Sequence, residues 1–275
     1  EILIFKDIQI SKIKYMPTND DPYSISLGFG VVIKKFALFW SQSTFDLVFA
    51  IGDRYEMCAA LQASIPFGIK AAHIHGGETS MGAIDNIYRD QLTRMAHIHL
   101  VSCKSHASRV KNISDNDKYI FNVGALSLYG LKNLKLPVWG TVCKNLSLPD
   151  APFVLITFHP ETVNYNNNSF YLTVIEKVLT ELSLNINLLV TGSNADTFGL
   201  GYKKLMKRLN RTFPDRIFFT ESLGKLKYFS ALKEASFLLG NSSSALIESA
   251  SFGKYCINVG DRQKGRKRNN NIIDV

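Results

Sequence analysis

Residues 47–74, LVFAIGDRYEMCAALQASIPFGIKAAHI, carry the pattern that decides the fold. Short apolar runs at 47–51 and 69–74 predict two strands, and the stretch 55–64 between them has a helical pattern. A strand, a helix and a strand in this order form a βαβ unit, whose two strands lie parallel in one sheet. Ligands of such sheets bind at the carboxyl ends of the strands.

The same alternation continues along the chain and predicts an α/β protein. In the first half it predicts further helices and strands at 84–95, 99–102, 105–112 and 120–123. Between about 126 and 152 it lapses into Leu, Lys, Pro, Gly and Asn, which indicates a linker. A second series then follows, at 153–157, 170–182, 187–190, 202–209, 217–219, 225–232, 237–239 and 255–259. We therefore expect two Rossmann-like domains, residues 1–145 and 146–275, facing each other across a central cleft.

Composition agrees with two domains, because 275 residues with 46% hydrophobic content can bury one large core or two ordinary ones. No apolar run approaches the roughly 20 residues that span a bilayer, and no signal peptide opens the chain, so we expect a cytoplasmic protein without a membrane partner. The four cysteines form no CxxC pair, which predicts reduced, mostly buried thiols. The chain begins at Glu1 and stops just after an apolar pair at 272–273 that should begin another element, so both domains are expected to be terminally incomplete.

The formal net charge of +9 favours an anionic ligand. Nucleic acid is one candidate, but aromatic residues do not alternate with the basic ones as a platform for single strands requires. A phosphorylated small molecule explains the same excess of charge. We therefore expect no nucleic-acid partner.

Residues 240–248, GNSSSALIE, predict a phosphate site. A glycine and three hydroxyl residues lie between an apolar strand and a helical run, where backbone N–H groups can hold a phosphate. Glu248 follows Ser244 by about one helical turn, so its carboxylate can accept both hydroxyls of a ribose. The alternative is that Ser242 and Ser243 only cap a helix and that Glu248 is a solvated surface residue.

Two loops in the first half also follow predicted strands. Asp53 and Arg54 close the strand at 47–51, with a helix N-cap as the alternative role of Asp53. In residues 73–78, HIHGGE, two glycines allow the backbone to approach a ligand closely. His73 and His75 have the spacing of strand-borne metal ligands, and strand alternation also points both toward a ligand pocket. Because no acidic partner stands beside the second such pair, at 97–99, we expect no metal.

The remaining candidates also lie near strand ends. Asp85 and Arg89 share a helical face, as an ordinary i,i+4 pair or with the carboxylate aimed at the cleft. In the second half, His159 ends one strand and residues 192–196, GSNAD, end the next, although each can be a simple turn. The candidates of the first domain are Asp53, Arg54, His75, Glu78, Asp85 and Arg89. Those of the second are His159, Asn194, Asp196, Asn241, Ser242, Ser243, Glu248, Arg262 and Arg266.

One domain is thus acidic, and the other has groups that hold phosphate. This division suits a sugar nucleotide across the cleft, with its sugar toward the carboxylates and its diphosphate toward the serines and arginines. The implied chemistry is proton transfer at the sugar, with a nucleoside diphosphate as leaving group.

Seven motifs in combination resemble the hydrolysing UDP-N-acetylglucosamine 2-epimerases of the sialic-acid type. The motifs are GDRYE at 52–56, HIHGGET at 73–79, GAID at 82–85 with Arg89, HP at 159–160, NAD at 194–196, GNSSS at 240–244 and GDRQKGR at 260–266. The resemblance runs nearly end to end and implies a glycosyltransferase-B-like fold. It implies elimination of UDP to a 2-acetamidoglucal, followed by addition of water to give N-acetylmannosamine, without a cofactor.

The resemblance also implies roles for the candidates. The implied catalytic residues are Asp53, Glu78, Asp85 and His159, and the implied ligands of UDP include Ser242, Ser243, Arg262 and, on the ribose, Glu248. Some relatives have a glutamate in place of His75, so His75 and Glu78 are both candidates for one acid–base role. A phosphate loop bearing Arg and Glu is expected before Glu1, and the oligomer is expected to be a dimer or tetramer.

The motifs leave several alternatives open within and beyond this family. The sugar could be a GDP- or UDP-linked diacetamido sugar, or the enzyme could be a non-hydrolysing 2-epimerase that adds UDP back. The chain could also be an inactive protein that binds nucleotide sugars.

Overall fold

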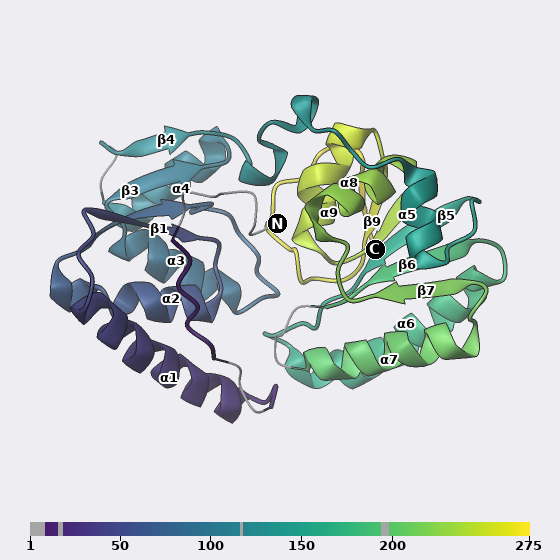
Figure 1. The fold of residues 1–275 in the computed structure, drawn as a ribbon, viewed down its shortest axis with the longest axis horizontal. Helices are drawn as coiled ribbons and strands as arrows, with labels where there is room; N and C mark the ends of the chain where they lie inside the picture. Colours follow the sequence, from purple (N-terminus) through teal and green to yellow (C-terminus); the bar gives the residue numbers. More distant parts are fainter. Residues whose placement is uncertain (1–8, 16–18, 116–117, 194–197) are drawn as a thin grey trace.

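The computed structural model describes residues 9–15, 19–115, 118–193 and 198–275. These ranges fold into two sheets of parallel strands with helices packed on them, which form the two halves of the molecule in Figure 1. In spatial order, the first sheet holds β1 (Leu47–Ile51), β2 (Lys70–Ile74), β3 (Ile98–Val101) and β4 (Ile120–Asn122). The second holds β10 (Ile272–Asp274), β9 (Cys256–Asn258), β8 (Phe237–Gly240), β5 (Phe153–Thr157), β6 (Asn187–Thr191) and β7 (Ile217–Thr220). The expected α/β class with two Rossmann-like halves is confirmed.

The helix α1 (Pro22–Ser41) precedes the first sheet. The helices that join its strands are α2 (Tyr55–Gln62), α3 (Asp85–Met95) and α4 (Lys104–Ser114), and a 3₁₀ turn spans Ile65–Phe67. Ala50 and Ala71 of the sheet pack in one buried cluster with Cys58 and Leu61 of α2 and Leu92 of α3. Cys58 and Leu61 lie three positions apart, so they share the helix face that covers the sheet.

The helix α1 changes one expectation drawn from the sequence. It has 20 residues and is apolar enough to cross a membrane by length and composition alone. The expectation that no apolar run approaches this length was wrong. Core helices and signal sequences meet the same criterion, and 22% of the apolar window of α1 is buried. Its Trp40 donates a hydrogen bond to the carbonyl of Ala60 in α2 (3.0 Å), which holds α1 against the first domain.

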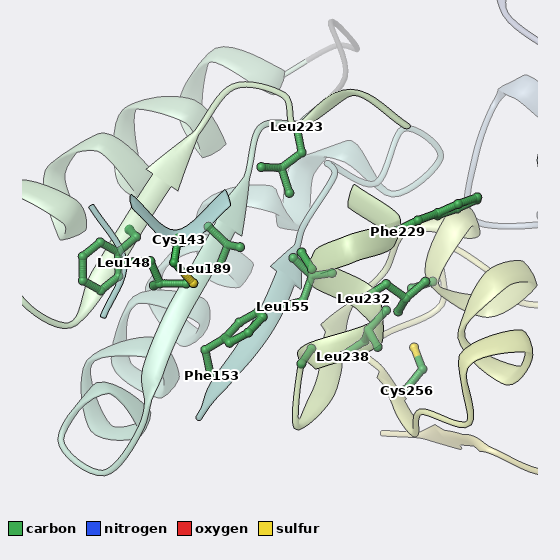
Figure 2. Close-up of a cluster of buried hydrophobic side chains, with 14 of the residues drawn as sticks. Cys143, Leu148, Phe153, Leu155, Leu189, Leu223, Phe229, Leu232, Leu238 and Cys256 are labelled. Carbon is green, nitrogen blue, oxygen red and sulfur yellow. The ribbon is translucent and has the colours of Figure 1, made fainter. Parts of the chain in front are cut away.

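The central strand β5 explains the continuous apolar run at 153–157. Phe153 and Leu155 pack into one buried cluster, shown in Figure 2, and Val154 and Ile156 into another. Successive side chains of a strand point to opposite faces, so a strand covered on both sides is apolar throughout. The helices that join the strands of the second sheet are α6 (Asn168–Ser183), α7 (Gly199–Thr212), α8 (Gly224–Glu234) and α9 (Ser243–Glu248).

The strand order of the second sheet reverses at β5, which pairs with β6 on one side and β8 on the other. Connections from these neighbouring strands leave in opposite directions, and this opens a crevice at their carboxyl ends. His159 follows β5 and Asn241 follows β8. The topology therefore places two of the candidate loops side by side.

The stretch between the two sheets contains more structure than the sequence predicts. Two 3₁₀ turns, Leu126–Leu128 and Leu131–Asn133, precede the helix α5 (Trp139–Leu146). The Trp139 ring stacks on Phe153 at a centroid distance of 4.8 Å, so α5 packs on the second sheet. A domain boundary between residues 145 and 146 stays a prediction, and it falls near the end of α5.

Candidate functional site

The two halves meet through the loops that follow their strands. The Met81 N–H donates to the carbonyl of Lys264 (2.9 Å), and the Ile84 N–H donates to the Thr162 hydroxyl (2.8 Å). A Cβ on Gly82 would lie 2.5 Å from the carbonyl oxygen of Asp261, so only glycine fits without movement there. Residues 78–85 of the first half are therefore in close contact with residues 261–266 of the second.

Glu78 lies at the centre of this contact and is 5% exposed. Its Oε1 accepts hydrogen bonds from His75 Nδ1 (2.8 Å) and the Ser102 hydroxyl (3.2 Å), and its Oε2 pairs with Arg266. Burial would raise the pKa of Glu78, but the hydrogen bond from His75 and the charge of Arg266 outweigh it and hold this pKa well below its usual range. Glu78 is therefore ionised at neutral pH, as a base requires.

His75 contacts Glu78 in an unusual backbone conformation. Its φ of 69° lies in the left-handed region, which is uncommon for a residue other than glycine. Its Nε2 accepts from the N–H of Leu126 (3.2 Å), so in this arrangement the proton is on Nδ1, which donates to Glu78. The two candidates for one acid–base role thus form a single hydrogen-bonded pair.

Arg89 joins Asp53 to the Glu78 loop. It is 1% exposed and donates to the Asp53 carboxylate, the Glu78 carbonyl (2.9 Å) and the Ser80 hydroxyl (3.1 Å). The structure therefore places Arg89 beneath the site, where it orients Asp53. The i,i+4 alternative is not the arrangement found, because Asp85 instead lies 3.8 Å from Arg262 Nη2, across the interface.

His73 is not a pocket residue, and the expectation that it faces a ligand together with His75 was wrong. It is fully buried, and its ring nitrogens contact the Thr93 hydroxyl (3.1 Å) and the Gly52 carbonyl (2.8 Å). Burial lowers the pKa of His73 to about 4, so the ring is neutral at physiological pH. Among the residues that the structure describes, no three His, Cys, Asp or Glu side chains are grouped to hold a metal ion.

A cavity of about 520 Å³ opens at the crevice beside β5 in the second sheet. Its lining includes His159, Ser242, Ser244, Lys225, Tyr228 and Glu248. The lining gathers hydroxyls, a lysine and a carboxylate at the carboxyl ends of parallel strands. Such a cavity suits a phosphorylated ligand with hydroxyl groups.

Glu248 is a buried wall of this cavity rather than a solvated surface residue. It is 6% exposed, and within the described ranges its Oε2 has no hydrogen-bond partner. Burial raises the pKa of Glu248 to about 7, although the Ser127 hydroxyl and the Lys225 charge oppose this. A buried carboxylate oxygen without a hydrogen-bond donor is unfavourable, and a ligand that donates a hydrogen bond to it removes this cost. Glu248 is therefore suited to accept hydrogen bonds from a hydroxyl-bearing ligand.

The serine loop, residues 240–244, has side chains that remain available to a ligand. No side-chain capping bond from Ser242 is seen in the described structure, and the Ser242 hydroxyl instead contacts that of Ser244 (2.8 Å). Asn241 is used within the protein, because its amide binds the N–H (2.7 Å) and the carbonyl (2.8 Å) of His159. Asn241 thus joins the loops after β5 and β8.

The other candidates have contacts of their own. Arg54 pairs with Glu56 (3.1 Å), and Arg262 donates from Nε to the Pro160 carbonyl (3.0 Å). Ser243 is the first residue of α9. Asn194 and Asp196 lie outside the described residues.

The sequence profile of the UDP-N-acetylglucosamine 2-epimerase family matches residues 2–275. The chain belongs to this family. It is 34% identical over 273 residues to GDP/UDP-N,N'-diacetylbacillosamine 2-epimerase (hydrolyzing) of Campylobacter jejuni, covering 98% of this chain and 71% of that protein. It is 30% identical over 229 residues to the UDP-N-acetylglucosamine 2-epimerase of Neisseria meningitidis, covering 83% of this chain and 59% of that protein. The chain thus spans 59% to 71% of the length of these two relatives.

Solved structures of this family share the fold. The UDP-GlcNAc 2-epimerase from Neisseria meningitidis bound to UDP-GlcNAc superposes with a TM-score of 0.71 at 16% identity, covering 90% of this chain and 67% of that chain. The Staphylococcus aureus MnaA–UDP structure gives a TM-score of 0.69 at 16% identity, covering 86% and 62%. These similarities support the glycosyltransferase-B-like arrangement of two Rossmann-like halves.

The structure of this epimerase-family chain adds residues that the sequence analysis missed. Arg109 of α4 donates to the Glu78 carbonyl (2.8 Å) and the Thr79 hydroxyl (2.6 Å), and Gln263 donates to the Asn241 carbonyl (2.8 Å). Arg109 is on a helix of a later βα unit, so no local motif marks it. Gln263 is a polar residue between the two arginines of the GDRQKGR motif. This position is the sequence signal that could have identified it as a site residue.

Proposed function

We propose that this chain forms the catalytic region of a hydrolysing 2-epimerase that acts on a UDP-linked 2-acetamido sugar. With UDP-N-acetylglucosamine, the simplest such substrate, the products are UDP and N-acetylmannosamine. The observation that carries this proposal is the placement of Asp53, Glu78 and Asp85 across the domain interface from a polar cavity walled by Glu248. The hydrolysing type is supported by the name of the Campylobacter relative.

The proposed first stage is elimination. A carboxylate takes the proton from C2, the C–H electron pair forms the C1=C2 double bond, and the C1–O bond breaks with its electrons passing to the diphosphate. Because no carbonyl adjoins C2, proton removal has to be coupled to departure of the diphosphate. Arg262, His159 and the serine loop are placed to stabilise the leaving charge, with Glu248 on the ribose.

The proposed second stage adds water across the double bond of the 2-acetamidoglucal. A hydroxyl adds at C1, and a proton returns to C2 from the face opposite to the one it left. Two faces need two groups, and the structure offers Asp53 and the His75–Glu78 pair on separate loops. We propose that these act on opposite faces, with Asp85 completing the acidic side.

A second candidate substrate is a nucleotide-linked diacetamido sugar undergoing the same chemistry. The name of the Campylobacter relative, at 34% identity, favours it. The 30% identical Neisseria relative has the name that corresponds to the first candidate. Both candidates share the 2-acetamido group and the nucleoside diphosphate.

Proton NMR of the intact protein incubated with UDP-N-acetylglucosamine in D₂O tests the proposed function. We expect free N-acetylmannosamine with deuterium at C2, together with UDP. Accumulation of UDP-N-acetylmannosamine would instead show a non-hydrolysing epimerase. Binding of UDP with no turnover of either candidate substrate would show a nucleotide-sugar-binding protein.

A further inference from the structure

A chain of hydrogen bonds leads from Glu78 into the helix α4. Ser102, which follows the last residue of β3, donates from its hydroxyl to Glu78 Oε1 (3.2 Å). The same hydroxyl contacts Nδ1 of His106 (2.8 Å), a residue in the first turn of α4. The proposed reaction assigns no role to Ser102 or His106. Their contacts nevertheless join them to its acid–base pair.

The direction of each hydrogen bond in this chain follows from its geometry. Glu78 is ionised, so its carboxylate can only accept hydrogen bonds. The Ser102 hydroxyl has one proton, which it donates to Glu78. His106 Nδ1 therefore has to be the donor to Ser102. This fixes the tautomer of His106 as the one with its proton on Nδ1.

The surroundings of His106 keep its ring neutral. Burial is the largest effect and lowers the pKa of His106. The charges of Arg266, Lys267 and Arg89 lower it too, whereas the charge of Glu78 raises it. A neutral ring can donate its hydrogen bond without adding another positive charge to this cluster.

The start of α4 also supports the backbone of the loop that contains Glu78. A Cβ on Gly77 would lie 2.4 Å from the His106 carbonyl oxygen, and Gly77 has a φ of 79°, so glycine is required there. Arg109, three positions after His106 in α4, donates to the Glu78 carbonyl (2.8 Å). Residues three apart share a helix face. One face of α4 thus holds the backbone of Glu78 and, through Ser102, its side chain.

The donors to the Glu78 carboxylate control how strongly it attracts a proton. Its Oε1 accepts from His75 and Ser102, and its Oε2 pairs with Arg266. A carboxylate that loses a donor becomes a stronger base. The hydrogen-bonded pair of His75 and Glu78 would then retain a proton up to a higher pH. Exchange of a proton with C2 depends on this balance.

We propose that Ser102 and His106 are positioning residues that hold the Glu78 carboxylate for proton transfer at C2. Ser102 acts on the carboxylate directly, and His106 acts through Ser102. This inference rests on the proposed function, because it assigns two further residues to the acid–base pair of that reaction.

The pH profile of UDP release from UDP-N-acetylglucosamine by the intact protein tests these roles. Ser102→Ala should lower kcat at neutral pH by about tenfold, because Glu78 loses a contact that orients it. It should also move the acid limb of kcat/KM upward by about half a pH unit or more, because a hydrogen bond to a charged group is lost. UDP affinity measured by calorimetry should change less than about twofold, since the nucleotide cavity lies in the second half.

Two variants of His106 separate its hydrogen bond from its packing. His106→Leu should move the acid limb in the same direction as Ser102→Ala. His106→Asn should return the limb to its wild-type position, because the amide N–H of asparagine can replace the Nδ1–H of histidine. A purely structural loss would lower turnover without moving the limb.

Ser105→Ala is the matched control. Ser105 is exposed in the same turn of α4, and in the part of the chain that the structure describes its hydroxyl contacts Cys103 Sγ (3.1 Å) and not Glu78. This variant should keep the wild-type rate and acid limb. The inference is overturned if Ser102→Ala and His106→Leu both keep the wild-type limb, or if His106→Asn moves it as far as His106→Leu does.

Nitrogen-15 NMR of the histidine side chains tests the same chain of hydrogen bonds without a reaction. The signals of His106, assigned by their loss in His106→Asn, should show a neutral ring with its proton on Nδ1 at neutral pH. Ser102→Ala should shift the Nδ1 signal, and Ser105→Ala should not. A proton on Nε2 of His106 in the wild type would overturn the inference. Release of UDP from neither candidate substrate by the wild type would overturn the proposed function itself, whichever tautomer is found.

Discussion

Arg266 and Glu78, 188 positions apart in the chain, form an ion pair between the two halves of the protein. Their side chains are 7% and 6% exposed, so the pair is shielded from water. Arg266 also donates from Nε to Gln263 (2.9 Å), which orients it within its own half. This pair therefore links the carboxylates of the first half to the GDRQKGR segment of the second half.

Arg266→Met should destabilise the protein by about 3–5 kcal/mol, because it leaves the Glu78 carboxylate buried without its cation. Urea unfolding should show this as a lower midpoint. Arg208→Met is the control, since Arg208 pairs with Glu176 at 2.7 Å but both side chains are exposed (58% and 41%). Its loss should amount to less than about 1 kcal/mol. Equal losses in the two variants would contradict the importance of burial.

Asp53→Asn should reduce turnover by about 100-fold or more while UDP affinity changes less than about threefold, because it removes a proton acceptor on the sugar side. Arg262→Ala should instead weaken UDP binding by about tenfold, through loss of a charge-assisted contact. Calorimetry with UDP and a UDP-release assay measure the two effects. A parallel loss of turnover and UDP affinity in Asp53→Asn would contradict this division of roles.

The elements that the sequence predicts well are those with a clear pattern. The run Phe153–Thr157 is predicted with its observed bounds, because a strand buried on both faces is apolar throughout. The helices α1 and α5 give weaker signals. Apolar residues occupy most of Pro22–Ser41, so no polar face marks a period, and Gly140 interrupts the short helix Trp139–Leu146.

The sequence predicts where the charged residues of the site lie, but not which of them form ion pairs with one another. Strand ends indicate that Asp53 and Glu78 lie near one another, and both contact the arginines of the site, because the carboxyl ends of parallel strands share one edge. The choice of Asp53 rather than Asp85 as the partner of Arg89 depends on how α3 packs beneath two loops. Sequence spacing on one helix contains no such information, and the same limit applies to the burial of His73.

Gly82→Ala should lower kcat/KM by about tenfold or more, because its methyl group would meet the backbone of Arg262 and Asp261 at 2.5 Å and separate the halves. Far-UV circular dichroism should remain that of the wild type. Gly30→Ala is the control: nothing lies within 4 Å of its added Cβ, and alanine in a helix is favoured by about 1 kcal/mol. Loss of activity in Gly30→Ala as well would show that the effect is not specific to the interface.

Glu248 should make the binding of uridine depend on pH. Ribose hydroxyls donate to the carboxylate, and burial raises the pKa of Glu248 to about 7, so uridine affinity should rise by about tenfold or more from pH 5.5 to 8. Uridine is preferred to UDP as the probe because it has no phosphate that titrates in this range. Glu248→Gln cannot ionise, and its affinity measured by calorimetry should be nearly flat over the same range.

The same raised pKa should affect folding. The unfolded chain ionises Glu248 near its ordinary pKa of 4.5, whereas the native protein keeps it protonated until about 7. Unfolding therefore becomes more favourable as the pH rises through this window, and the contribution is constant above it. Glu248→Gln should abolish this part of the pH dependence in urea unfolding. If Glu248→Gln has the same pH dependence as the wild type, both in uridine binding and in unfolding, then both effects come from another group.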